Sequence, residues 1–353
     1  MDTKSAGKEK LERTGDGTRG TYLLTIRRVS FDASEAESFR EYFRSVAIAC
    51  DVLVIDGSTP EVFAAHAQAW DGVCQHAGVD PQFKYLNGKV NGIHTGVNIS
   101  AHDPIILADD DIRYTPDDLR RMIALLGDYE MVRPQNYLSP LPFWARTEAA
   151  RMLINRAWIA EGDYPGTLGV RRSTMLRVGH YDGDVLFDNE EIVRHFRARG
   201  AHIAYARDFF ILKHPPTRRK WLEQRPRQAY EDFVMRTKTA FFAALPLVLA
   251  LVWFISGWKG ALAFVAALAC SAILVAARGL GDGAANFFPA RLCLYAPLWV
   301  AERVVSTYWA FYWRVAHGGY PFGDKLVAKG TGRAWRAGGN RPASSTPSKL
   351  WNE

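Results

Sequence analysis

The sequence predicts an α/β fold in which a mostly parallel sheet carries helices on both faces, followed by C-terminal transmembrane or interfacial helices. Short apolar runs alternate with helical segments between residues 21 and 235, the pattern of parallel strands joined by helical crossovers. Three consecutive aspartates, 109–111, follow one of these runs. Two runs without a charged residue, 239–256 and 261–277, each approach the length that crosses a bilayer as a helix.

The 353 residues divide into four expected regions. Residues 1–20 are polar and charged without an apolar core, which argues against a signal peptide and predicts a disordered tail. Residues 21–235 form the expected α/β domain, residues 236–316 the membrane region and residues 317–353 a basic tail. The net charge of +7 is mild and the arginine-rich segments adjoin apolar ones, so it favours a membrane surface over nucleic acid as a partner.

The elements of the α/β domain follow from local signals. Ser34 and Glu37 have capping-box spacing, and Pro60 suits the first position of a helix that Thr59 caps. Short apolar, β-branched runs predict strands at 22–29, 51–58 (ending in a turn), 83–86, 105–108, 131–134 and 203–205. The expected helices are 34–49, one from residue 60, 91–101, one from about residue 115, 143–160 and one ending at residue 200.

The three aspartates are the strongest functional signal. In an extended segment Asp109 and Asp111 point to one side and Asp110 to the other. Two carboxylates at the carboxyl end of a buried strand lie where open α/β sheets bind ligands, and their oxygens suit Mg2+ or Mn2+. The alternative is a solvated acidic turn before the next helix.

Other charged residues are expected at the same edge of the sheet. Asp56 ends the second strand and Lys89 precedes a helix, so both should lie near the aspartates. A second acidic cluster contains Asp188, Glu190 and Glu191, although part of it is ordinary negative charge at the start of a helix.

The membrane region predicts a helical hairpin, because two apolar runs flank a short turn that contains a tryptophan. A third run, 292–316, carries Glu302, Arg303 and Arg314, which are costly inside a bilayer, so it is expected in the interface or against the α/β domain. The basic tail should stay on the cytoplasmic side. We expect a multi-pass protein of the cell inner (cytoplasmic) membrane with its α/β domain in the cytoplasm.

From residues 22 to 233 the chain resembles the membrane-anchored family 2 glycosyltransferases, including ceramide glucosyltransferase-like enzymes. The resemblance rests on the order and spacing of four motifs: Val54-Ile55-Asp56-Gly57-Ser58, Gly88-Lys89-Val90-Asn91-Gly92 followed by Asn98, Leu107-Ala108-Asp109-Asp110-Asp111, and Gln224-Arg225-Pro226-Arg227. It implies the GT-A fold.

The resemblance also implies roles for individual residues. Asp56 would hold the nucleotide base, and Lys89 and Asp110 would lie beside the donor. Asp109 and Asp111 match the DxD metal site for Mg2+ or Mn2+. The segment that contains Gln224, Arg225 and Arg227 resembles the QxxRW motif, which closes over the donor or the nascent product.

Two departures from the family pattern concern stacking and the base. Gln228 stands where the family has tryptophan, so Tyr230 or Trp221 would have to supply the stacking. The usual catalytic aspartate position holds Asn189, which cannot take a proton. The catalytic base is therefore expected to be Asp188, Glu190 or Glu191, with Asp188 preferred.

The resemblance implies an inverting transfer of a sugar from a UDP- or GDP-linked donor to a membrane-associated, lipid acceptor. A metal would offset charge on the leaving diphosphate, and a carboxylate would take the proton of the acceptor hydroxyl. Trp144 and Trp158 of the 143–160 helix are candidates to line the lipid entry.

Three alternatives stay open. A processive polysaccharide synthase uses the same chemistry, a nucleotidyltransferase of related fold shares the sheet and metal carboxylates, and a membrane-tethered binding protein would have a decayed site. The sugar, the nucleotide and the acceptor are not specified by the sequence.

Overall fold

The computed structural model describes residues 19–322 and 325–332. Of the two expected tails, residues 1–20 lie outside the described residues except for the last two, and residues 317–353 lie outside them at 323–324 and from 333 onward.

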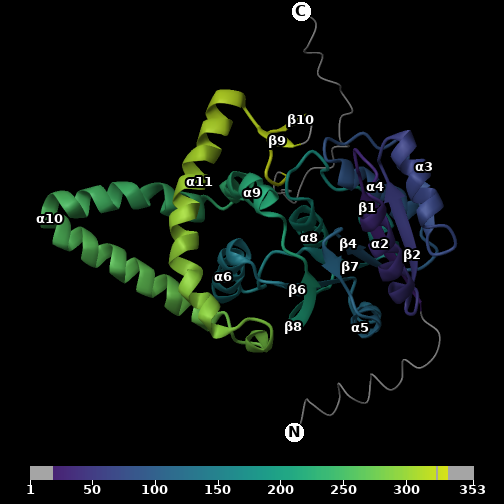
Figure 1. Cartoon of the computed structure of the whole chain (residues 1–353), viewed down its shortest axis with the longest axis horizontal. Helices are drawn as coiled ribbons and strands as arrows, with labels where there is room; N and C mark the ends of the chain where they lie inside the picture. The colour runs from purple at the N-terminus through teal and green to yellow at the C-terminus, as the bar shows by residue number, and fades with distance from the viewer. Residues whose placement is uncertain (1–18, 323–324, 333–353) are drawn as a thin grey trace, which may run out of the picture.

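In the described part of the chain, eight strands form one sheet in the order β3-β2-β1-β4-β7-β6-β8-β5 (Figure 1). The strands are β1 (Gly20–Ile26), β2 (Cys50–Asp56), β3 (Gln75–Gly78), β4 (Pro104–Ala108), β5 (Ile112–Arg113), β6 (Met131–Leu138), β7 (Thr167–Arg171) and β8 (Ile203–Lys213). The pairs β3–β2, β2–β1, β1–β4 and β6–β8 are parallel, whereas β4–β7, β7–β6 and β8–β5 are antiparallel. The expected α/β class with a mostly parallel sheet is confirmed.

Helices cover both faces of this sheet because its strands are apolar on both sides. Tyr22 and Leu24 of β1 belong to the core beneath α2 and α5, whereas Leu23 between them belongs to the core beneath α4 and α8. The helices of the domain are α2 (Ala33–Val46), α3 (Pro60–Ala69), α4 (Gly88–Ile99), α5 (Pro116–Leu126), α6 (Phe143–Trp158), α7 (Arg172–Val178), α8 (Asp188–Ala198) and α9 (Arg218–Glu231).

Two local predictions are wrong. Residues 83–86 form a loop and not a strand, because the Tyr85 N–H donates to the Asn91 side chain and the Leu86 N–H to Asp184. The first helix is capped by Asp32, which accepts from the backbone N–H groups of the next turn, and not by Ser34. Both errors come from side chains that replace backbone partners.

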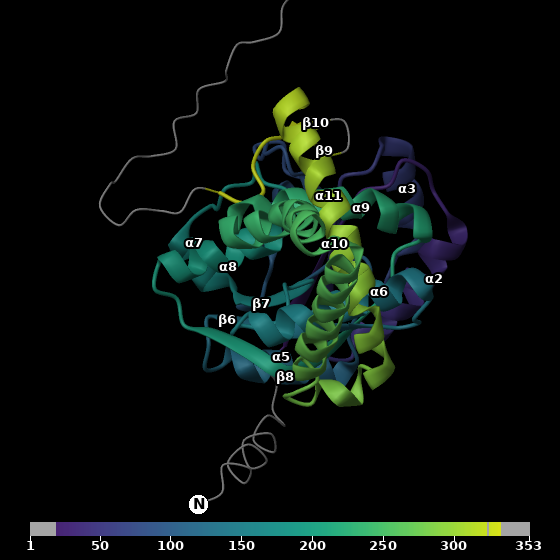
Figure 2. The same cartoon turned by 90° about the vertical axis from the view of Figure 1, so that its left-hand side faces the viewer.

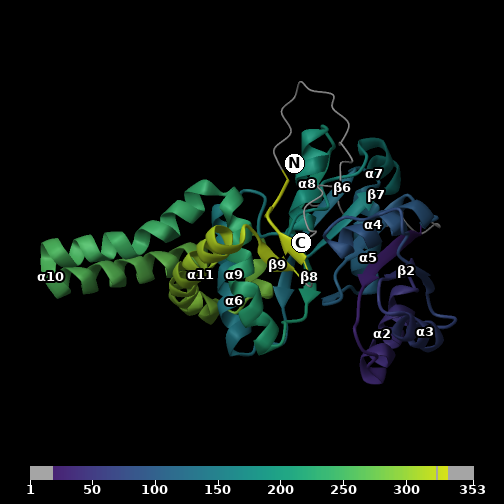
Figure 3. The same cartoon turned by 90° about the horizontal axis from the view of Figure 1, so that it is seen from above.

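The apolar runs after residue 235 form two helical arms, labelled together as α10 (Arg236–Arg278), and the chain reverses direction between them (Figure 1). Gly257 has φ 65° and ψ −169°, a conformation that glycine adopts without steric cost. The two arms of α10 extend away from the sheet, as the view from above shows (Figure 3). Among the described residues, α10 is the one helix long and apolar enough to cross a membrane.

The third apolar run, 292–316, packs against the domain instead of standing alone. It forms α11 (Ala296–His317), which crosses the base of the hairpin when the molecule is viewed along α10 (Figure 2). Trp299 of α11 shares a core with Phe242 of α10 and Leu153 of α6. Short elements complete the chain: 3-10 helices at Asp232–Val234, Ala284–Asn286 and Ala290–Tyr295, and the pair β9 (Tyr320–Phe322) and β10 (Lys325–Val327).

Candidate active site

A cavity of about 750 Å³ opens at the carboxyl ends of β1, β2 and β4. Thr25, Ile55 and Asp109 mark the three strand ends on its wall. The opposite wall comes from α6, α9 and the bases of α10 and α11. The cavity therefore lies between the ligand-binding edge of the sheet and the hairpin.

Each carboxylate of the aspartate triplet pairs with a cation from a different element. Lys89 in the first turn of α4 contacts Asp109, Arg28 after β1 lies 2.7 Å from Asp110, and Lys213 at the end of β8 lies 3.2 Å from Asp111. All six side chains line the cavity. The repulsion among three adjacent carboxylates is thus offset by long-range ion pairs.

The pKa shifts follow from burial and from these pairs. Burial raises the pKa of the Asp111 carboxyl, Lys213 opposes the rise, and Asp109 and Asp110 add to it. Burial would raise the pKa of the Asp110 carboxyl, but Arg28 and Lys220 hold this pKa below its ordinary value. Burial alone would lower the pKa of Lys89, yet Asp109 and Asp188 raise it.

Lys89 joins the two acidic clusters that are far apart in sequence. Its Nζ lies 2.8 Å from a carboxylate oxygen of Asp188, at the start of α8, and donates to Asn189 Oδ1 at 3.0 Å. Asp188 and Asn189 line the cavity with Asp109. One lysine thus bridges the metal-type carboxylates and the candidate base.

Glu190 and Glu191, the other two candidate bases, do not line the cavity. Glu190 lies 3.6 Å from Arg133, and Glu191 accepts from Arg194 and from the Gly332 N–H. Glu190 projects about 100° around α8 from Asn189. Glu191 lies on the same side of the helix as Asp188 but is held by Arg194 and by the Gly332 N–H. Of the three candidate bases, Asp188 is the one that lines the cavity, and the choice of base stays a prediction.

Asp56 was expected to contact the donor, but its carboxylate is buried beside the cavity and does not line it. It accepts from the Ser58 N–H and lies 2.7 Å from His66 and 3.1 Å from His76. Burial opposes ionisation, yet these hydrogen bonds hold the pKa of Asp56 well below its usual range. The carboxylate organises the end of β2.

The residues of the segment 224–227 do not all line the cavity. Gln224 and Arg227 line the cavity. Arg225 points to Glu148 at 2.6 Å, is 4% exposed and does not line the cavity, and its expected donor contact stays a prediction. Gln228 also lines the cavity, donates to Glu148 and accepts from Arg303. The residue that replaces the family's tryptophan is therefore part of a polar network.

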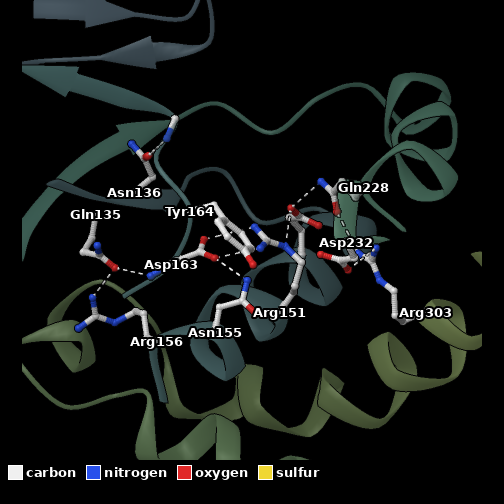
Figure 4. Close-up of polar contacts among 12 residues, drawn as sticks. Gln135, Asn136, Arg151, Asn155, Arg156, Asp163, Tyr164, Gln228, Asp232 and Arg303 are labelled. Carbon is white, nitrogen blue, oxygen red and sulfur yellow. Dashed lines mark hydrogen bonds and ion pairs between the residues drawn. The ribbon is translucent and has the colours of Figure 1, made fainter. Parts of the chain in front are cut away.

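Sequence reasoning missed a group of charged residues on the hairpin side. We call this part of the cavity the hairpin-side chamber; it is lined by Glu148, Arg151, Asp163, Asp232, Lys238 and Arg303. Figure 4 shows Arg151, Asp163, Asp232 and Arg303. The sequence does not show that these residues lie close together, because they belong to distant elements: α6, a loop, the junction of α9 with α10, and α11. The only sequence signal was the costly charge of Arg303 inside an apolar run.

Asp109 and Asp111 offer the hard oxygen atoms that Mg2+ and Mn2+ prefer. No group of three His, Cys, Asp or Glu side chains within 19–322 and 325–332 is arranged to hold a metal. The two carboxylates fit a cation that also takes oxygens from a bound diphosphate and from water.

No protein-family model matches the chain, and no curated protein matches it. Among solved structures it is similar to a mannosyltransferase from Pyrobaculum calidifontis in complex with GDP-Man and Mn2+, with 18% identity, TM-score 0.48 and coverage of 86% of this chain and 93% of that one. It is also similar to glucosyl-3-phosphoglycerate synthase from Mycobacterium tuberculosis, with 14% identity, TM-score 0.39 and coverage of 58% and 73%. A putative nucleotide-diphospho-sugar transferase from Desulfovibrio desulfuricans gives 9% identity, TM-score 0.32 and coverage of 56% and 81%.

Proposed function

We propose that the protein is a glycosyltransferase that moves a sugar from a nucleotide-sugar donor to a membrane-associated, lipid acceptor. The observation that carries the proposal is the convergence of Asp109, Asp111, Lys89 and Asp188 in one cavity at the base of an apolar hairpin. These residues come from two distant parts of the sequence. Placement in family 2 and the ceramide glucosyltransferase-like subgroup rests on the motif resemblance alone.

The donor diphosphate would bind where cations gather at the sheet edge. Arg28, Lys89 and Lys213 line this part of the cavity, and Gly88 places the backbone N–H groups of the α4 N-terminus there. Helix N-termini and arginine forks both favour phosphate oxygens. Asp109 and Asp111 would hold Mg2+ or Mn2+, which offsets charge on the departing nucleoside diphosphate.

Asp188 would serve as the catalytic base for a single, inverting displacement. Among the three acids at the start of α8, it alone lines the cavity. Its ion pair with Lys89 keeps the carboxylate ready to accept the proton of an acceptor hydroxyl. Leaving-group protonation is not needed, because a diphosphate leaves as an anion.

The acceptor class follows from the exposed surface of α10. Large apolar side chains along both arms, including Leu251, Trp253, Phe254 and Leu262, face outward. Such a surface is stable in a bilayer and costly in water. We propose that both arms enter the cytoplasmic membrane with the cavity at its surface, which makes the protein multi-pass.

Product analysis tests the proposal. The full-length protein in detergent is incubated with UDP- and GDP-sugars, Mn2+ or Mg2+ and a lipid extract, and nucleotide and lipid products are separated. We expect nucleoside diphosphate and a glycosylated lipid, both lost in Asp111→Asn. Pyrophosphate would indicate nucleotidyl transfer, long polymers a polysaccharide synthase, and no donor turnover a binding protein.

A further inference from the structure

The chain returns to the α/β domain after α11. The short strands β9 and β10, drawn in yellow, lie between α11 and the sheet (Figure 1). Residues 328–332 follow β10, and we call them the return segment. The return segment is hydrogen-bonded to the start of α8, the helix whose first residue is Asp188. It therefore connects α11 with the candidate base.

Two backbone hydrogen bonds attach the return segment to the residues directly before the base. The Leu186 N–H donates to the Lys329 carbonyl oxygen at 3.0 Å. The Phe187 N–H donates to the Gly330 carbonyl oxygen at the same distance. Among the described residues no side chain caps α8 at Phe187, so the orientation of its first turn depends on contacts from outside the helix.

Side chains add to this attachment. Glu191 in the first turn of α8 accepts from the Gly332 N–H at 2.7 Å, and Arg194 donates to the Gly332 carbonyl oxygen at 2.8 Å. Lys329 pairs with Asp182 at 2.8 Å. Glu191, which the sequence places among the candidate bases, thus holds the return segment.

The return segment is also fixed to α9 and α11. Tyr230 of α9 and Arg314 of α11 both donate to the carbonyl oxygen of Ala328, at 3.0 Å and 2.8 Å. Leu186 shares a small core with Tyr230 and with Ala310 of α11. Because close-packed side chains transmit displacements, the position of the residues before the base follows the position of α11.

Gly330 occupies a buried space that is too narrow for a side chain. A Cβ at this position would lie 3.1 Å from the Cα and the carbonyl oxygen of Glu231, at the end of α9, and 3.4 Å from the Tyr230 carbonyl oxygen. These are backbone atoms of a helix, which cannot rotate aside as a side chain does. A larger residue at 330 would therefore displace the return segment from the acceptor position that Phe187 uses.

We propose that the return segment positions the base, holding Asp188 where it can take the proton of an acceptor hydroxyl. The inference rests on the proposed function for the role of Asp188, and it goes beyond that function by assigning a role to residues 328–332. The geometry of the base then depends on how α11 packs against the domain. A misplacement of about 1 Å at a reacting group can lower the rate about 100-fold, so a small movement of the segment is sufficient.

Gly330→Val in the full-length protein tests both the attachment and its consequence. Hydrogen exchange at the Leu186 and Phe187 amides should become about tenfold faster or more, because their acceptors are displaced. The kcat of sugar transfer should fall about tenfold or more, whereas the Kd of UDP or GDP with Mn2+ should change less than about twofold. A loss in kcat without a loss in nucleotide binding is the expected signature of a misplaced base.

Ala328→Val is the matched control, because Ala328 belongs to the same segment and its side chain is exposed. It should change amide exchange, kcat and Kd less than about twofold, as surface substitutions usually do. Unchanged exchange at Leu186 and Phe187 in Gly330→Val would overturn the inference, and so would faster exchange with an unchanged kcat. Parallel losses of kcat and nucleotide binding would indicate a general structural role and overturn it as well.

Failure of the proposed function gives a different result. A wild-type protein that transfers no sugar would refute the transferase, and the catalytic role of the return segment would fall with it. Faster amide exchange in Gly330→Val would then still confirm that the segment holds Leu186 and Phe187. Exchange is measured without donor or acceptor, so the two failures are distinguishable.

Discussion

At the residue scale, the chemistry of the cavity depends on which side chains pair across the fold. Lys89 holds Asp109 and Asp188 together, although 79 residues separate those two carboxylates in the sequence. A neutral residue there would remove the ion-pair partner of Asp109 and of Asp188.

Lys89→Met should reduce donor turnover, as kcat/KM, at least 100-fold, because an electrostatic contact to the leaving group is lost. Lys84→Met, at an exposed position outside the cavity, is the matched control and should change kcat/KM less than twofold. Steady-state release of nucleoside diphosphate measures both. Wild-type turnover by Lys89→Met would remove this residue from the donor site.

The identity of the base is tested by a pair of neighbouring acids in α8. Asp188→Asn should lower kcat about 100-fold or more, whereas Glu190→Gln, which faces Arg133, should lower it less than threefold. Single-turnover kinetics at saturating donor separate the chemical step from binding. Equal losses in the two variants would contradict the assignment of Asp188.

At the scale of elements, local sequence sets each helix, and the fold sets its direction. The hairpin illustrates this at Gly257, which is exposed and has no heavy atom within 4 Å of an added Cβ. A larger residue would therefore meet no packing clash. The left-handed backbone is the sole source of strain there.

Gly257→Ala should destabilise the folded protein by about 1–3 kcal/mol, because φ 65° with ψ −169° lies in a backbone region that residues with a Cβ essentially do not adopt. Gly281→Ala is the control, because Gly281 has an ordinary φ and its added Cβ would meet nothing closer than 3.6 Å. Denaturant unfolding in detergent, followed by fluorescence, gives both values. Equal stability of the two variants would show that the reversal tolerates other residues.

At the scale of the whole molecule, the hairpin adjoins the cavity, because the start of α10 forms part of the cavity wall. The sheet edge supplies Asp109, Asp111 and Lys213, whereas α10 and α11 supply Lys238 and Arg303. Membrane insertion would therefore hold the cavity close to the bilayer surface. Under the proposed function, an acceptor in the membrane would then lie close to the cavity in which the sugar is transferred.

Leu251→Arg should reduce the membrane-bound fraction, because an arginine near the middle of an inserted arm costs about 2.5–3.5 kcal/mol. Leu251 is 57% exposed, and Leu176 in α7, at 50%, offers a control in the α/β domain. Sedimentation of the protein with vesicles measures partition. If Leu176→Arg had the same effect, the hairpin would not be the membrane contact.

The sequence determined the features that depend on near neighbours. Apolar runs predict β1, β2, β4, β6 and β8 and most helices, but not β3, β5 or β7. The uncharged runs predict α10, and the aspartate triplet predicts an acidic strand end. These signals need only periodicity and composition. Where side chains replaced backbone partners, as at Tyr85 and Asp32, the local prediction failed.

Only the tertiary structure decided which charged groups meet. It paired each aspartate of 109–111 with its own cation, turned Glu190 and Glu191 away from the cavity and assembled the hairpin-side chamber from distant elements. Local sequence specifies how a segment folds but not which distant segment it contacts. The direction of a side chain and the identity of its long-range partner are set by packing of the whole chain.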